Sequence, residues 1–157
     1  MVEQQEASED AVMTRIGQAI MLLHGGDREE ARNRFGALWS ELGADGDALH
    51  RCTLAHYMAD TQDDPGDELA WDLRALTAAE GADGGRAAEH RDLPAVRAFY
   101  PSLHLNLAAD YLKLQRPDSA RIHLRRARAA AESLADDGYG GGVRAAIDRL
   151  ELRLREQ

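Results

Sequence analysis

The stretch NLAADYLKLQRPDSARIHLRRARAAAE, residues 106–132, decides the fold class because two amphipathic helices and the turn between them can be read from it. Pro117 and Asp118 in the segment QRPD favour a turn followed by a helix start. Apolar residues recur at helical spacing on both sides of that turn, and they are Leu107, Ala108, Tyr111, Ala120, Leu124 and Ala127. Because Ala108 and Ala120 are small, the two helices can approach closely while larger residues fill the space beside them. The stretch therefore predicts a helical hairpin.

Turn signals divide the whole chain into further helical segments. Breaks rich in Gly, Asp and Pro lie at residues 24–27, 43–47, 63–67, 80–85, 115–118 and 136–142. No window alternates β-branched residues with a period of two, so strands are not expected. The sequence predicts seven helices, at about 9–23, 27–42, 47–61, 66–79, 101–115, 118–135 and 142–156. Residues 92–100 form either a short helix or the start of a long one kinked at Pro101.

The hairpin pattern resembles the tetratricopeptide repeat, a helix–turn–helix unit of about 34 residues. Two further units carry the same apolar spacing, the first in Ala19, Leu22, Ala31, Phe35 and Leu38, and the second in Leu54, Ala55, Met58, Leu69, Leu73 and Leu76. Some positions depart from the family pattern: Glu132 stands where a closing proline is common, Gln18 stands where leucine is preferred, and Leu69 replaces the usual alanine.

The resemblance implies an all-α, right-handed helical-hairpin solenoid in a single domain over residues 1–157. Its repeat-like units would lie at about 9–43, 47–80 and 101–135, with an insertion at 81–99. The last helix, at 142–156, has one apolar stripe, formed by Val143, Ile147, Leu150 and Leu154. A stripe on one side only is what a C-terminal capping helix needs, because the last repeat would otherwise expose its apolar flank.

Composition and charge narrow the class of protein. The single cysteine, Cys52, excludes an internal disulfide and favours the reducing cytoplasm. The acidic N-terminus lacks the features of a signal peptide, and the longest apolar run, residues 19–23, is too short to span a bilayer. Residues 1–93 hold 20 acidic and 8 basic residues, a net charge of −12, which makes nucleic acid an unlikely partner. The near absence of lysine indicates a GC-rich bacterial genome.

In the tetratricopeptide family the first helix of each repeat lines a concave groove that receives a peptide or helix. The resemblance therefore implies a non-enzymatic protein-interaction module or scaffold in a bacterial cytoplasm, without catalytic residues, metal or cofactor. Carried over by position, the groove residues would be Met13, Ile16, Ile20, Leu23, Leu49, Cys52, His56, Asp60, Leu105, Ala109, Leu112 and Lys113. An apolar helix, or the surface of a second copy in a weak homodimer, is the expected ligand.

Three alternatives to this interpretation arise from particular residues. Cys52, His56 and Asp60 recur every four residues along one helix, a spacing that brings potential zinc ligands to one face. Cys52 and His56 alone could form a nucleophile and base, and the acidic loop at 60–68 is spaced somewhat like a calcium loop. The zinc site is disfavoured because one helix rarely supplies three ligands to one ion. The nucleophile is disfavoured because Cys52 lies mid-helix, where the backbone N–H groups are bonded within the helix and cannot form an oxyanion hole. No metal and no catalysis are therefore predicted.

A different interaction surface is suggested by the segment RIHLRRAR. Arg121, Arg125 and Arg128 share one helical face, and such a face can bind phosphate or an acidic partner. The alternative function is therefore a regulatory subunit of a transcription factor or enzyme encoded nearby, which docks through this arginine face.

Overall fold

The computed structural model describes residues 2–84 and 93–156, and every regular element in them is a helix. The helices are α1 (Val2–His24), α2 (Arg28–Leu42), α3 (Ala48–Ala59), α4 (Pro65–Gly84), α5 (Leu93–Lys113), α6 (Pro117–Ala131) and α7 (Gly138–Arg155). The all-α class and the seven helices predicted from the sequence are confirmed for these residues.

The boundaries of α1, α4 and α5 were predicted wrongly. α1 begins at Val2 rather than near residue 9, and α4 continues through Gly81 to Gly84. α5 begins at Leu93 and runs through Pro101, so residues 93–100 are the start of a long helix, as the second alternative predicted. Both ends of the predicted insertion at 81–99 are thus helical, and its middle lies outside the described residues.

Close contact between backbones explains why α6 ends early and α7 begins early. Asp137 caps α7 by accepting a 2.8 Å hydrogen bond from the backbone N–H of Gly140. A side chain at Gly140 would not fit, since a Cβ there would lie 2.1 Å from the carbonyl oxygen of Ala135. Arg144 of α7 donates to the carbonyl oxygens of Ala131 at 3.1 Å and Leu134 at 2.6 Å. These bonds satisfy carbonyls that the end of α6 leaves without helical partners.

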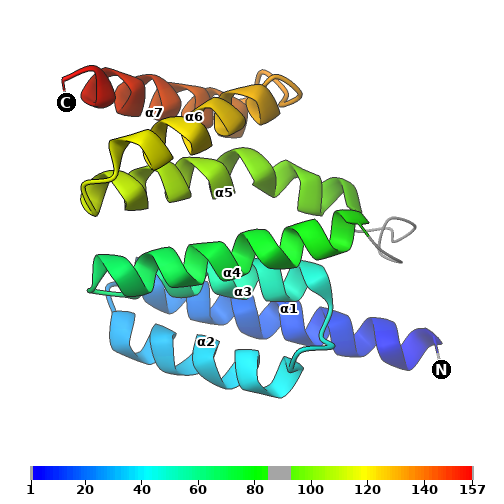
Figure 1. Cartoon of the computed structure of the whole chain (residues 1–157). Coiled ribbons are helices and arrows are strands. Elements are labelled where there is room, and N and C mark those ends of the chain that lie inside the picture. The colour runs from blue at the N-terminus through cyan, green and yellow to red at the C-terminus, as the bar shows by residue number, and fades with distance from the viewer. Residues whose placement is uncertain (1, 85–92, 157) are drawn as a thin grey trace.

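The helices form a stack in chain order, with α1 and α2 at one end and α7 at the other (Figure 1). Each helix packs mainly against the helix before it and the helix after it, and longer-range contacts join α1 to α3, α3 to α5 and α5 to α7. Three core clusters follow the stack: one around Phe35 from α1–α3, one around Leu107 from α3–α5, and one around Ile147 from α5–α7. The odd-numbered helices therefore neighbour one another along one side of the molecule.

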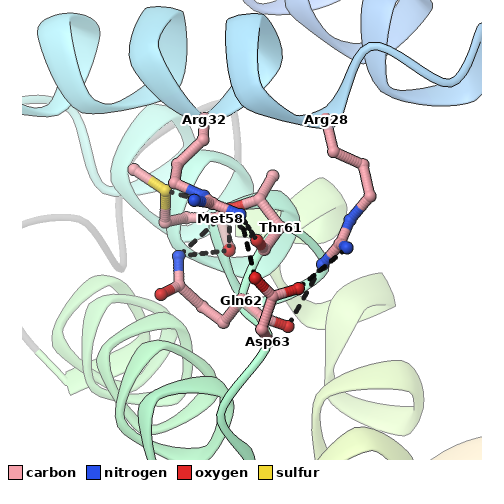
Figure 2. Close-up of polar contacts among 6 residues, drawn as sticks. All are labelled: Arg28, Arg32, Met58, Thr61, Gln62 and Asp63. Atoms are coloured by element: carbon pink, nitrogen blue, oxygen red, sulfur yellow. Dashed lines mark hydrogen bonds and ion pairs between the residues drawn. The ribbon is translucent and has the colours of Figure 1, made fainter.

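Two arginines of α2 hold the turn between α3 and α4 (Figure 2). Arg32 donates to the carbonyl oxygen of Thr61 through Nε at 3.1 Å and through a terminal nitrogen at 2.5 Å. Arg28 lies 2.9 Å from the carboxylate of Asp63 and also donates to the carbonyl of Gln62 at 3.2 Å. Because the last carbonyls of a helix have no partners within it, these bonds fix the second hairpin against the first. We call this set of contacts the arginine clamp.

We expect Arg32→Met to lower the free energy of unfolding by about 1–2 kcal/mol, since it removes charge-assisted hydrogen bonds but keeps most of the apolar stem. The matched control is Arg34→Met on the same helix, whose partner is the exposed Glu30 four residues earlier. Exposed pairs of that kind contribute well under 1 kcal/mol. Urea unfolding of both variants measures the difference, and equal midpoints would show that the clamp adds no stability.

We expect Ala120→Leu to destabilise the protein by about 1–3 kcal/mol through overpacking. Ala120 is fully buried and packs in the cluster that also contains Ala108 and Leu124, at the contact of α5 and α6. The control is Ala129→Leu, because Ala129 is exposed on the same helix. Thermal unfolding compares the two, and an unchanged midpoint for Ala120→Leu would contradict this helix pairing.

Candidate functional site

The structure separates the predicted groove residues by their exposure. Ile16 and Cys52 are fully buried, and Leu112 is nearly so, because each packs into a core cluster between helices. These three side chains therefore lie inside the core and not on an open surface. Half-buried positions are Ile20, Leu23, Leu49, His56, Leu105 and Ala109, and exposed ones are Met13, Asp60 and Lys113.

The C-terminal ends of α1, α3 and α5 converge on one side of the stack. His24 ends α1, Asp60 follows α3, and Lys113 ends α5. Partial loss of hydration and the nearby Glu68 raise the pKa of the Asp60 carboxyl, whereas Lys113 and His24 act in the opposite direction. Electrostatic interactions of Asp60 with Lys113 and His24 place the three helix ends within reach of one another.

The same side of the stack continues along α3, α5 and α7. The Nδ1 atom of His56 on α3 lies 3.3 Å from Nδ2 of Asn106 on α5. Tyr139 of α7 forms a 2.6 Å hydrogen bond with the Ser102 hydroxyl of α5, and its hydroxyl donates to the carbonyl of Ala98 at 3.2 Å. Tyr57 of α3 also interacts electrostatically with Tyr139. We call this side, formed by α1, α3, α5 and α7, the odd-helix face.

Beneath this face lies a pair of carboxyl groups that the sequence analysis missed. Asp72 of α4 is 1% exposed and Asp110 of α5 is 2% exposed. Oδ1 of Asp72 and Oδ2 of Asp110 are buried and have no hydrogen-bond partner. Glu68, one turn before Asp72, lies 2.8 Å from Nζ of Lys113 and interacts with both buried carboxyls. Together with Asp60, we call Glu68, Asp72 and Asp110 the carboxyl cluster.

Burial dominates the protonation of this pair. Loss of hydration, followed by the hydrogen bond and the charge of Asp110, raises the pKa of Asp72 to about 11. Loss of hydration raises the pKa of Asp110 to about 6, although its hydrogen bond with Asp72 acts in the opposite direction. At neutral pH the pair therefore shares one proton.

The sequence does contain a signal for the two buried carboxyls, because each aspartate lies on an apolar stripe of its helix. Asp72 lies between Leu69 and Leu76 at helical spacing, and Asp110 follows Leu107 by three residues in the stretch that predicts the hairpin. An aspartate on an apolar stripe is unusual, because an isolated buried carboxylate is costly. Such residues are therefore candidates for a functional or paired site.

Cys52 and His56 do not have the protonation that a nucleophile and base require. Burial raises the pKa of the Cys52 thiol to about 12 and lowers the pKa of His56 to about 4. The thiol therefore stays protonated at neutral pH, whereas a nucleophilic cysteine needs a lowered pKa. Among the described residues, no three His, Cys, Asp or Glu side chains are arranged to hold a metal ion.

The predicted arginine face lines a groove of about 430 Å³ between α6 and α7. Arg121 pairs with Asp118 at 3.0 Å, and Arg128 pairs with Asp148 at 2.9 Å and with Glu151 at 2.6 Å. Four arginines line this groove together with Glu151, and they are Arg121, Arg125, Arg128 and Arg155. The acids of α7 thus neutralise part of the charge that the α6 arginines present.

A stack of four rings joins α5 to α6 and was also missed from the sequence. His104 and His123 lie with their rings 5.3 Å apart and their Nδ1 atoms 3.1 Å apart. Tyr100 stacks on His104, and Tyr111 stacks on His123. Burial lowers the pKa of both histidines, and the nearby Arg126 lowers them further. The neutral imidazoles therefore act as flat packing surfaces between the two helices at neutral pH.

No helix among the described residues has the length and apolar character needed to cross a membrane. Comparison with known proteins gives no match to this chain, neither among family models nor among curated proteins and solved structures.

Proposed function

We propose that this protein is a non-enzymatic interaction module of the bacterial cytoplasm, whose stacked hairpins form a tetratricopeptide-like solenoid. A partner protein binds on the odd-helix face. The observation that supports this proposal is the convergence of side chains from four helices on one side, from His24 of α1 to Tyr139 of α7. Residues so far apart in the chain together provide a surface long enough for an extended peptide or a helix.

The odd-helix face offers both apolar and polar contacts. Ile20, Leu105 and Ala109 are half-buried, so part of their apolar surface remains for a ligand. Asp60 and Lys113 are exposed and would border that apolar surface with charge. An apolar centre with a polar rim is the usual composition of a protein–protein interface.

The arginine face remains a second candidate, as the docking surface of a regulatory subunit. It is favoured by the groove that Arg121, Arg125 and Arg128 line, and it is weakened by the ion pairs that Arg121 and Arg128 already form. A ligand there would have to be acidic and would compete with Asp118 and Asp148 for these guanidinium groups.

Site-specific crosslinking in the native host distinguishes the two surfaces. A photoreactive residue placed at Met13 or at Lys113 should crosslink to the same partner, because both exposed positions lie on the odd-numbered helices. Ile122 on α6 is the control, since it is as exposed as Met13 but belongs to an even-numbered helix. A partner captured from Arg125, and not from the two test positions, would favour the arginine face instead.

A crosslink from Met13 to a second copy of the chain would identify the weak homodimer as the occupant. Light scattering of the purified protein at increasing concentration would then show a mass above that of the monomer.

A further inference from the structure

The groove between α6 and α7 contains a guanidinium group that the chain itself does not pair. Four arginines and Glu151 line this groove, whose volume is about 430 Å³. In the part of the chain that the structure describes, the ion pairs of these arginines involve Arg121, Arg128 and Arg155 but not Arg125. Arg125 is exposed and lines the groove near the middle of α6. A concave surface with several guanidinium groups, one of them unpaired, points to an anionic ligand.

The paired arginines of the groove also keep hydrogen-bond donors for a ligand. Asp148 and Glu151 both accept from the same terminal nitrogen of Arg128, Nη2, at 2.9 and 2.6 Å. Its Nη1 and Nε atoms therefore have donors left, since neither bonds to a described residue. The acids in these pairs, Asp118 among them, are partly or fully exposed. Exposed ion pairs contribute little stability, so a ligand can replace these carboxylates at small cost.

We infer that this groove binds a phosphorylated serine or threonine side chain of a partner protein. A carboxylate of the partner would only exchange for a carboxylate that the chain already supplies. A phosphate monoester carries a charge of about −1.5 to −2 at neutral pH and three acceptor oxygens, so it can bond to Arg125 and to a neighbouring arginine at once. The inference extends the second candidate function by naming its ligand, and it does not depend on a partner at the odd-helix face.

The surroundings of the groove favour a phosphorylated protein over a nucleic acid. Among the described residues that line it, none has an aromatic ring on which a base could stack. The chain as a whole has a net charge of −9, which repels a long polyanion but tolerates a single phosphate group. Leu124 and Leu154 also line the groove, so they can contact the peptide residues on either side of the phosphate.

The test uses the full chain and a capped pentapeptide with phosphoserine at its centre and a leucine on each side of it. Nitrogen-15 NMR at pH 7.5 and constant ionic strength should show a saturable shift of the Arg125 Nε–H resonance. The unphosphorylated peptide, and the peptide with glutamate in place of phosphoserine, should bind at least about tenfold more weakly. Inorganic phosphate should also bind more weakly than the phosphopeptide, because it makes no contact with Leu124 or Leu154. A single-stranded oligonucleotide tests the nucleic-acid alternative.

Matched variants, measured by fluorescence anisotropy of the labelled phosphopeptide, assign binding to the groove. Arg125→Gln should weaken binding by about tenfold or more and leave the thermal midpoint unchanged, because no ion pair is lost. Arg149→Gln is the control, since Arg149 is exposed on α7 but does not line the groove, and it should bind normally. Asp148→Asn should strengthen binding, because it removes one carboxylate that competes for Arg128. Such a gain of affinity cannot result from a folding defect.

The inference is overturned if the phosphopeptide shows no saturable binding or binds Arg125→Gln unchanged. It is also overturned if the glutamate peptide, inorganic phosphate or the oligonucleotide binds as tightly as the phosphopeptide, since the ligand would then be of another class. If the phosphopeptide binds but no partner crosslinks from Met13 or Lys113, the proposal for the odd-helix face fails and the phosphate site stands. If a partner crosslinks there and the phosphopeptide does not bind, only the phosphate site fails.

Discussion

Replacing Ile16 with aspartate is expected to lower the free energy of unfolding by about 4 kcal/mol or more. Ile16 is 1% exposed and packs in the cluster around Phe35, so the variant both removes apolar contacts and places a charge in the interior. Single domains are stable by only about 5–15 kcal/mol, and the variant should therefore be largely unfolded or close to it.

Met13→Asp is the matched control, one helical turn away on α1. Met13 is 40% exposed, so an aspartate there remains hydrated and should cost less than about 1 kcal/mol. Urea unfolding monitored by circular dichroism measures both variants. A stable Ile16→Asp protein would mean that Ile16 faces a groove, as the family resemblance implied, and that α1 packs differently from the structure described above.

Asp110→Asn is expected to remove a loss of stability, on the order of 2–3 kcal/mol, that the unmodified protein shows as the pH rises from 4 to 8. The carboxyl of Asp110 has a pKa of about 6 in the folded protein, above its ordinary value of 3.8. A raised pKa means that the folded state binds the proton more tightly than the unfolded chain. The resulting stability is fully present below pH 4 and is lost as the pH rises through 6. An asparagine has no proton to lose, and its amide can still bond to Asp72.

Urea unfolding between pH 4 and pH 8 tests this linkage. The stability of the unmodified protein should fall over that range relative to Asp110→Asn, while Asp118→Asn should follow the unmodified protein. The prediction fails if the free energy of unfolding falls between pH 5 and pH 8 by the same amount in Asp110→Asn as in the unmodified protein.

The C-terminal part of the fold was readable from the sequence because its apolar residues are regularly spaced. The stripes predicted for α6 and α7, which include Ala120, Leu124, Ile147 and Leu150, are buried as expected. Strong helix formers surround these positions, and local preference and tertiary packing therefore agree there.

The buried side of α4 could not be predicted from the sequence, because an aspartate lies on that side while a neighbouring leucine is partly exposed. Leu73 was predicted to face the core, yet it is 38% exposed, whereas Asp72 beside it is buried. The helix is rotated so that Ala75 and Ala79 pack against the neighbouring helices. Burial of Asp72 on this side is tolerated because its carboxyl pairs with that of Asp110. Asp110 lies 38 residues later, so the pairing cannot be predicted from the local sequence pattern of α4.

Three of the predicted groove residues are buried for a related reason. Carrying positions over from a repeat family assumes that each first helix presents the same residues to the inner side. Ile16 and Cys52 instead contact the next helices along the chain, which a degenerate motif cannot specify. The buried carboxyl cluster and the ring stack depend on contacts between helices. Their residues can be noticed one by one in the sequence, but their proximity in space cannot be predicted from it.

The division of the core into three clusters has a consequence for how the chain folds. Each cluster is built by helices that follow one another, so closing it requires only short loops, and folding should be fast for a chain of this length. A terminal pair of helices can also open at the cost of one cluster while the others persist. Native-state hydrogen exchange should then reveal graded protection along the chain, with α1 and α2 opening separately from α5 and α6.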